Sequence, residues 1–144
     1  MSSPEDEVRA ASERFYAALN RMANGDDGSI ASAWSQGEAV TTMHPVQGRQ
    51  VGWSQVRDSF HQFSLVASAG QIRLEEQAIK VAGDFAYELG CERGSLKLGG
   101  HPVQVDSRVT NIYRREAGDW KLVHHHSDLA PAMMAALDRL SGKA

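Results

Sequence analysis

The first third of the chain has apolar residues at helical spacing. Ser3 and Pro4 form a typical helix start, a capping hydroxyl followed by proline at the first helical position. Asn24-Gly25 is a typical helix end. Between them, the apolar positions three or four residues apart are Val8, Ala11, Phe15, Leu19 and Met22. This pattern predicts a long amphipathic helix, and residues 29–34 predict a short second helix.

The next segment passes from β-forming residues to a further helical pattern. Residues 39–44 are rich in β-formers and stop at Pro45, which favours an extended backbone at His44 and so predicts a strand. Beyond it, Ser54 can cap a helix and Gly70 can end one, so a third helix is expected between them. The apolar face of this helix is expected to carry Val56, Phe60, Phe63 and Val66.

The rest of the chain alternates with a period of two. Strands are predicted from residue 72, over 85–91, over 103–115 and over 120–127, with glycine-containing turns between them. Pro131 then opens a last helix. Helices followed by a meander of antiparallel strands predict a single α+β domain over residues 1–144. A strongly curved sheet wrapped around the first helix forms a cone, and such concave ends are where small-molecule sites tend to lie.

Composition narrows the classes of function. A hydrophobic fraction of 42% in 144 residues is enough for one core. The net charge of −3 comes from 15 basic and 18 acidic residues spread along the chain, without the basic stripe of a nucleic-acid-binding protein. The single cysteine, Cys91, excludes an intramolecular disulfide and a multi-cysteine zinc site. We therefore expect no nucleic acid among the partners.

Two further patterns bear on location and cofactors. The acidic residues 5–7 are unlike a secretory signal, and no apolar run approaches membrane-spanning length. We therefore expect a cytoplasmic protein without a membrane partner. No phosphate loop or dinucleotide fingerprint occurs in the sequence, so no cofactor is expected.

The last two predicted strands carry a family resemblance. Residues 107–115, the Gly118-Asp119 turn and residues 120–127 look like the end of the SnoaL-like proteins and of the calcium/calmodulin-dependent protein kinase association domain. The order of elements along nearly the whole chain also resembles the nuclear transport factor 2-like superfamily, which has the cystatin-like fold. This resemblance implies a conical barrel, a homodimer formed through the outer face of the sheet, and a pocket between the sheet and the first helices.

A shorter resemblance concerns the segment Met43-His44-Pro45. Ketosteroid isomerases of the same superfamily have a catalytic aspartate immediately before a proline at this point, and here His44 stands in its place. Such an isomerase also needs a tyrosine and a protonated aspartate as an oxyanion hole, and Tyr16 is the one residue that matches. The isomerase activity is therefore not carried over. His44 remains a candidate general base and Tyr16 a candidate donor, with a merely hydrogen-bonding role for His44 as the alternative.

Arg108 is a candidate ligand-binding residue. In the kinase association domain an arginine in a similar sequence context faces the cavity, which implies that Arg108 binds a ligand carboxylate. The alternative is a salt bridge to Glu88 or Asp106.

The three consecutive histidines of the last strand cannot act from one face, because successive side chains alternate. Alternation predicts one row of Trp120, Leu122, His124 and His126, and another of Val123, His125 and Ser127. The resemblance favours His125 and Ser127 for the pocket, and the opposite assignment stays open. His124 and His126 could instead chelate a metal, with His44 as a third ligand.

These patterns support three hypotheses of function. The first is an acid–base isomerase, cyclase or hydratase acting on a small carbonyl or carboxylate compound. The second is a non-catalytic module that binds a ligand or drives oligomerisation, and the third is a metal-dependent protein. Aromatic residues expected to line an apolar pocket, with simple core packing as the alternative, are Trp34, Trp53, Phe60 and Tyr87.

Overall fold

The protein is an α+β domain, as predicted. The structure, a computed structural model, describes residues 2–128 and 131–142. Its helices are α1 (Pro4–Met22), α2 (Ile30–Ala33), α3 (Trp53–Ser64) and α4 (Pro131–Leu140). Its strands are β1 (Thr41–Met43), β2 (Arg49–Val51), β3 (Ala67–Ala82), β4 (Phe85–Leu98), β5 (His101–Glu116) and β6 (Asp119–Ser127).

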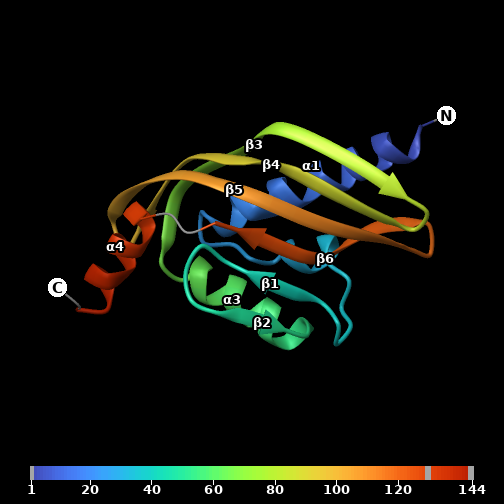
Figure 1. The fold of residues 1–144 in the computed structure, drawn as a ribbon. Helices are drawn as coiled ribbons and strands as arrows, with labels where there is room; N and C mark the ends of the chain where they lie inside the picture. Colours follow the sequence, from blue (N-terminus) through green and yellow to red (C-terminus); the bar gives the residue numbers. More distant parts are fainter. Residues whose placement is uncertain (1, 129–130, 143–144) are drawn as a thin grey trace.

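The strands form one curved sheet in the order β2-β1-β6-β5-β4-β3. β3 to β6 are an antiparallel meander, whereas β1 pairs with β6 in parallel, with Thr42 opposite His125. Figure 1 shows the sheet bending over α1, with α3 below and α4 at one end. The concave face of the sheet and the helices α1 to α3 enclose the core. The cone expected from the sequence is therefore present.

Two asparagines fix α1 against the start of β3. The Asn20 side chain donates to the Ile72 carbonyl at 2.7 Å and accepts from the Ile72 N–H at 2.7 Å. One turn later, Asn24 makes the same pair of bonds to the backbone of Gly70. A Cβ at Gly70 would lie 2.3 Å from the Ala23 Cβ, so this close approach requires glycine. The contacts hold α1 along the concave side of the sheet.

The helix α3 differs from its prediction at both ends. It begins at Trp53 after Gly52, whose φ of 85° suits glycine, and not at a cap formed by Ser54. It ends at Ser64, and β3 begins at Ala67, where the sequence predicted helix as far as Gly70. Pairing of this segment with the end of β4 outweighs its helical spacing. The short strand β2 was not predicted.

A bulge in β6 changes which residues face inward. Ile112 pairs with His124 but the next residue, Tyr113, pairs with Leu122, so Val123 is the extra residue. Trp120 and Leu122 are consequently buried on the same side as His125 and Ser127. The prediction that Trp120 and Leu122 share a row with His124 and His126 was wrong, because strict alternation does not survive a bulge.

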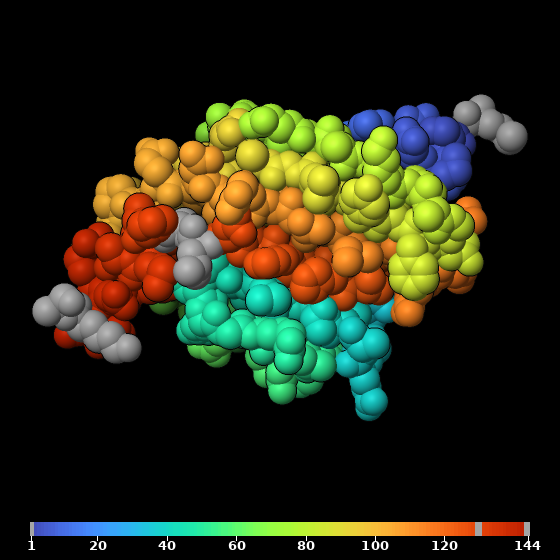
Figure 2. Space-filling model, in the orientation of Figure 1, coloured from blue at the N-terminus to red at the C-terminus, as the bar shows by residue number. Residues whose placement is uncertain are grey.

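The outer face of the sheet is open. Figure 2 shows this face, with β3 to β6 and β1 uncovered and α4 at its edge. The row of large apolar side chains on the outer face of β4 consists of Phe85, Tyr87 and Leu89, which are 51%, 46% and 43% exposed. None of the helices in the described part of the chain is both long and apolar enough to cross a membrane.

Candidate active site

A small cavity of about 50 Å³ lies inside the cone. Its wall is formed by α1, α3, the concave face of the sheet and Met133 of α4. The apolar lining residues are Leu19, Met22, Pro45, Phe60, Phe63, Ile72, Leu96, Val105 and Met133. The polar lining residues are His44, Glu92, Ser107, His125 and Ser127.

Glu92 is the only carboxyl group among the described residues that line this cavity. The inward row of β4 contains Ala86, Glu88, Glu92 and Leu96, all buried, so strand alternation aims the Glu92 side chain into the cone. Burial raises the pKa of Glu92 to about 7, although hydrogen bonds from Tyr16 and Ser127 act in the opposite direction. The group therefore exists in both protonation states near neutral pH.

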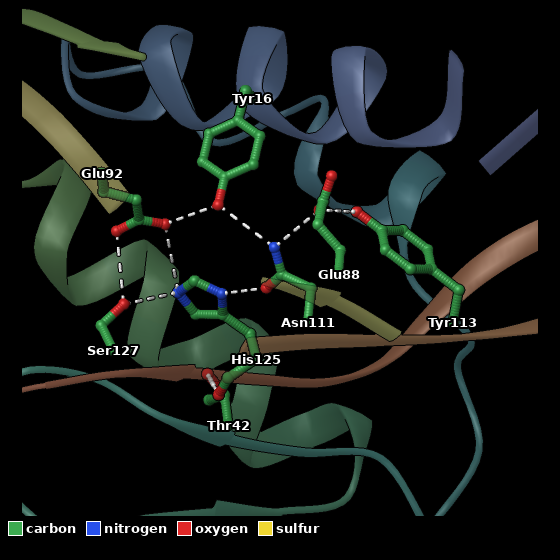
Figure 3. A network of polar contacts seen from close by, with 8 residues as sticks. All are labelled: Tyr16, Thr42, Glu88, Glu92, Asn111, Tyr113, His125 and Ser127. Atoms are coloured by element: carbon green, nitrogen blue, oxygen red, sulfur yellow. Dashed lines mark hydrogen bonds and ion pairs between the residues drawn. The ribbon is translucent and has the colours of Figure 1, made fainter. Parts of the chain in front are cut away.

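Glu92 belongs to a ring of five buried side chains (Figure 3). Tyr16 donates its hydroxyl to Glu92 Oε2 at 2.8 Å, and Ser127 Oγ lies 3.3 Å from Glu92 Oε1. Ser127 Oγ is also 3.2 Å from His125 Nε2. His125 Nδ1 lies 2.6 Å from Asn111 Oδ1, and Asn111 donates to the Tyr16 hydroxyl at 3.1 Å. The ring thus joins α1 to β4, β5 and β6.

The positions of the protons in this ring follow from the atoms that can only accept a hydrogen bond. The Asn111 oxygen can only accept, so His125 carries its proton on Nδ1 and offers Nε2 as an acceptor. When Glu92 is protonated, it can donate to Ser127, and Ser127 can donate to His125. When Glu92 is ionised, the single Ser127 proton serves either Glu92 or His125.

A second buried carboxyl, Glu88, supports the ring from outside the cavity. It accepts hydrogen bonds from Gln77 at 2.7 Å, Asn111 at 3.0 Å and Tyr113 at 2.9 Å. Asn111 thereby uses one amide hydrogen for Glu88 and the other for Tyr16. These contacts fix the orientation of Asn111 and, through it, the tautomer of His125.

His44 lies in the cavity wall just after β1. Its Nε2 is 2.8 Å from Ser59 Oγ, and the Ser59 hydroxyl donates to the Val56 carbonyl, so His44 is the donor in this pair. Burial lowers the pKa of His44 to about 4. A neutral imidazole with so low a pKa is a poor base at neutral pH, and Glu92 is better matched to that role.

Of the other residues that the sequence predicted for the pocket, some line the cavity and others pack around it. Tyr16 is 7% exposed but its hydroxyl faces Glu92 and does not line the cavity. Phe60 lines the cavity, whereas Trp34 and Trp53 pack behind it with ring centroids 6.4 Å apart. These two tryptophans therefore belong to the core beside the pocket.

Tyr87 and Arg108 do not face the cone. Tyr87 is on the exposed outer row of β4, and the Arg108 side chain is 84% exposed and forms an ion pair with Asp128. The expectation that these two residues face the pocket was wrong, because the inward rows of β4 and β5 are those of Glu88 and of Asn111. The ion pair of Arg108 is also with neither Glu88 nor Asp106.

The three histidines of β6 are divided between the two faces. His125 and Ser127 lie inside, 3% and 2% exposed, whereas His124 and His126 lie on the outer face with ring centroids 6.2 Å apart. His44 is on the inner side and cannot join them. Within residues 2–128 and 131–142, no three His, Cys, Asp or Glu side chains could hold a metal ion.

Glu92 and Ser107 were missed by the sequence reasoning. On β4 the apolar row of Phe85, Tyr87 and Leu89 was interpreted as the inner row, but it is the outer row. The available signal was the alternate row, where Glu88 and Glu92 recur at even spacing across a strand of a strongly curved sheet. Two carboxyl groups on one row indicate either a solvated face or a buried polar site.

The comparisons with known proteins agree with this geometry. The fold is that of the nuclear transport factor 2-like structures, with a helix-filled conical sheet. The model of the SnoaL-like domain family matches residues 8–133, so the chain belongs to this family. No curated protein sequence matches the chain.

Several solved structures are similar to it. A candidate dehydratase of the NTF2-like family from Streptomyces avermitilis has 25% identity and a TM-score of 0.72, with 86% of this chain and 94% of that chain covered. A candidate calcium/calmodulin-dependent protein kinase type II association domain from Thiobacillus denitrificans has 26% identity and a TM-score of 0.65, with coverage of 85% and 94%. A ketosteroid isomerase-like protein from Erwinia carotovora shares the fold at 14% identity, a TM-score of 0.74 and coverage of 89% and 97%.

Proposed function

We propose that this protein is an acid–base enzyme of the isomerase, cyclase or hydratase type, and that Glu92 exchanges protons with a small molecule in the cone. One observation carries the proposal. A buried carboxyl in the wall of a mainly apolar cavity is joined to a buried imidazole by one serine hydroxyl. Because burial raises the pKa of Glu92 to about 7, this carboxyl can take up and release a proton near neutral pH.

The chemistry that fits this arrangement is proton abstraction next to a carbonyl group. Ionised Glu92 takes the proton from the carbon, and the electron pair of the broken C–H bond moves toward the carbonyl oxygen. The proton then returns from Glu92 to another carbon of the same molecule, which frees Glu92 again. Burial raises the pKa of Tyr16 well above its usual value, so Tyr16 stays protonated and holds Glu92 in place.

The similarity to the candidate dehydratase supports this proposal. Loss of water from a carbonyl compound begins with the same proton abstraction and ends with protonation of the departing hydroxyl. A carboxyl with a pKa of about 7 can do both at neutral pH.

The test is deuterium exchange in a panel of small ketones and aldehydes dissolved in D₂O. We expect the protein to speed incorporation of deuterium next to the carbonyl, and Glu92→Gln to abolish this. The amide is a close mimic of protonated Glu92, since it can donate to Ser127 and accept from Tyr16, so the fold is kept. Glu13→Gln, an exposed change on α1, is the matched control. Equal exchange by wild type and Glu92→Gln would reject the proposal.

A second candidate function is ligand binding without turnover. It is favoured by the similarity to the candidate kinase association domain, which has the highest sequence identity of the three structures described above, at 26% against 25% and 14%. In this case a ketone would saturate the cavity while its hydrogens exchange no faster than in buffer. Binding and exchange measured on the same samples therefore separate the two functions.

We further propose that the protein is a homodimer in which a second copy covers the row Phe85, Tyr87 and Leu89. Three large apolar side chains in one exposed row are an unusual surface for a monomer. A charge in this row, as in Leu89→Lys, is expected to yield monomers in sedimentation measurements. A wild-type protein that sediments as a monomer at micromolar concentration would contradict the proposal.

A further inference from the structure

Ser107 lies in the wall of the cavity and has an unsatisfied hydroxyl group. The residue is 3% exposed and lines the cavity, and its Oγ has no hydrogen-bond partner in the described parts of the chain. On β5 it stands directly opposite Glu92 of β4, so the two side chains leave the sheet as neighbours. A buried hydroxyl without a partner destabilises the folded protein, so it is a group that a ligand can satisfy.

The rest of the wall favours a hydrocarbon body. Apart from the polar side chains of His44, Glu92, Ser107, His125 and Ser127, the cavity is lined by aliphatic, aromatic and methionine side chains and Pro45. Transfer of an apolar group into such a space is favourable, whereas a second polar group would lose its hydration without a new partner.

The charges of the wall disfavour an anionic ligand. Among the described residues, no lysine or arginine lines the cavity. Burial lowers the pKa of His44 to about 4 and that of His125 well below its usual value, so both rings are neutral at pH 7. Glu92 is then the one lining group that can be charged, and its charge is negative. A ligand carboxylate would be buried beside it without a counter-charge.

We infer that the ligand is a small molecule without a negative charge, with a hydrocarbon body and one carbonyl oxygen, and that Ser107 binds this oxygen by donating a hydrogen bond. The inference names the substrate class of the proposed acid–base site, and the assignment of Glu92 as the reacting group rests on that proposed function. With the oxygen on Ser107, the opposed Glu92 lies beside the carbon next to the carbonyl.

The size of the cavity limits the ligand to about one ring. A cavity volume of about 50 Å³ is well below the volume of several hundred cubic ångströms that is typical of sites for larger ligands. Met133 closes one side, and its unbranched side chain can rotate to enlarge the space. A six-membered ring with one oxygen is therefore a suitable probe.

The first experiment compares three probes with the same ring: cyclohexanone, cyclohexanol and cyclohexanecarboxylate. Binding to the full chain at pH 7 is followed by chemical-shift changes of the cavity methyl groups. We expect cyclohexanone to saturate, cyclohexanol to bind more weakly, and the carboxylate not to saturate. Saturation by the carboxylate at the concentrations of the ketone, or saturation by none of the three, would overturn the inference.

The second experiment replaces Ser107 by alanine. Because the hydroxyl is unsatisfied without ligand, Ser107→Ala should raise the midpoint of thermal unfolding by about 3 °C and weaken cyclohexanone binding about tenfold. Ser35→Ala is the matched control, since Ser35 is equally buried but donates to Glu116 outside the cavity. It should lower the midpoint and leave binding unchanged. Unchanged cyclohexanone affinity in Ser107→Ala would also overturn the inference.

The two proposals fail in different ways. Tight, Ser107-dependent binding of the ketone without deuterium exchange would remove the proposed enzyme activity and keep the ligand class. Exchange that depends on Glu92 but not on Ser107, with carboxylates bound equally well, would keep the activity and remove the ligand class.

Discussion

Ser127 Oγ lies 3.2 Å from His125 Nε2 and 3.3 Å from Glu92 Oε1, so one hydroxyl proton is shared between two acceptors. The His125 ring cannot turn to relieve this competition, because Asn111 holds its other nitrogen and Phe15 packs against it with ring centroids 5.3 Å apart. Protonation of Glu92 resolves the competition by supplying a second donor. The protonation state of one carboxyl is therefore coupled to the hydrogen bonding of the whole ring.

This coupling makes the stability of the protein depend on pH through Glu92. The Glu92 pKa is about 7 in the folded protein and 4.5 in the reference state, so the folded state holds its proton more tightly. The stabilisation of the folded protein by protonated Glu92 is fully present below pH 4.5 and is lost as the pH rises through 7. A pKa change of this size corresponds to about 3 kcal/mol.

Glu92→Gln isolates this effect because glutamine does not titrate. We expect the free energy of unfolding of the wild type, minus that of Glu92→Gln, to fall by about 3 kcal/mol between pH 4.5 and pH 8. The buried histidines have lowered pKa values and act with the opposite sign below pH 6.5, but they are common to both proteins. Urea unfolding at several pH values measures the difference. A difference that does not change with pH would contradict the buried, raised-pKa state of Glu92.

Tyr16 is expected to tune the Glu92 pKa. Its hydroxyl donates to Glu92 and stabilises the ionised carboxylate, so Tyr16→Phe should raise the Glu92 pKa above 7. The carboxyl resonance of ¹³C-labelled glutamate, followed during a pH titration, measures it. Tyr113→Phe is the control, because it removes a hydroxyl from Glu88 instead. Equal Glu92 titration curves in wild type and Tyr16→Phe would show that this hydrogen bond does not act on Glu92.

Adjacent histidines of β6 should respond differently to removal. His125→Ala removes a buried ring that contacts Phe15, leaves the Asn111 side-chain oxygen without a donor and removes one of the two partners of Ser127, so we expect a loss of about 3 kcal/mol in the free energy of unfolding. His126→Ala, on the outer face, should cost less than about 1 kcal/mol. Urea unfolding of both variants makes the comparison. Similar losses would contradict the division of the strand into inner and outer residues.

Much of the fold could be predicted from the sequence because its elements follow simple periods. α1 has a capping serine, an N-terminal proline and regular apolar spacing, and all three are present in the structure. The turns at Gly83 and Gly99 likewise separate strands as expected. The predicted end of α3 was wrong because Ala67 and Ser68 pair with Leu98 and Lys97 of β4, about 30 residues away, and local spacing does not report such a contact.

The candidate site was harder to predict for a physical reason. In an ordinary half-buried strand the apolar row is the inner one. In β4 the inner row carries Glu88 and Glu92 and the outer row carries Phe85 and Tyr87, so hydrophobicity indicates the wrong face. In β6 the bulge at Val123 shifts the inward row, and that bulge depends on pairing with β5. The reversed rows of β4 and the bulge of β6 both lie at the polar ring. There, the packing of the site outweighs the alternation of apolar and polar residues along each strand.

The methionine pair in α4 tests whether this helix limits access to the cavity. Met133 is 4% exposed and lines the cavity, whereas its neighbour Met134 is 39% exposed. Met133→Ala should lower the free energy of unfolding by about 2–3 kcal/mol and create space next to the existing cavity. Met134→Ala should change stability by less than about 1 kcal/mol, since its side chain is largely in solvent.

The added space should be available to a ligand. Because the cavity is only about 50 Å³, the enlarged cavity of Met133→Ala should bind cyclohexanone more tightly than the wild type does, despite the lower stability of the variant. Met134→Ala should bind it with wild-type affinity. The same chemical-shift titration measures all three proteins. Weaker binding by Met133→Ala than by Met134→Ala would show that the Met133 side chain contacts the ligand favourably and does not restrict its space.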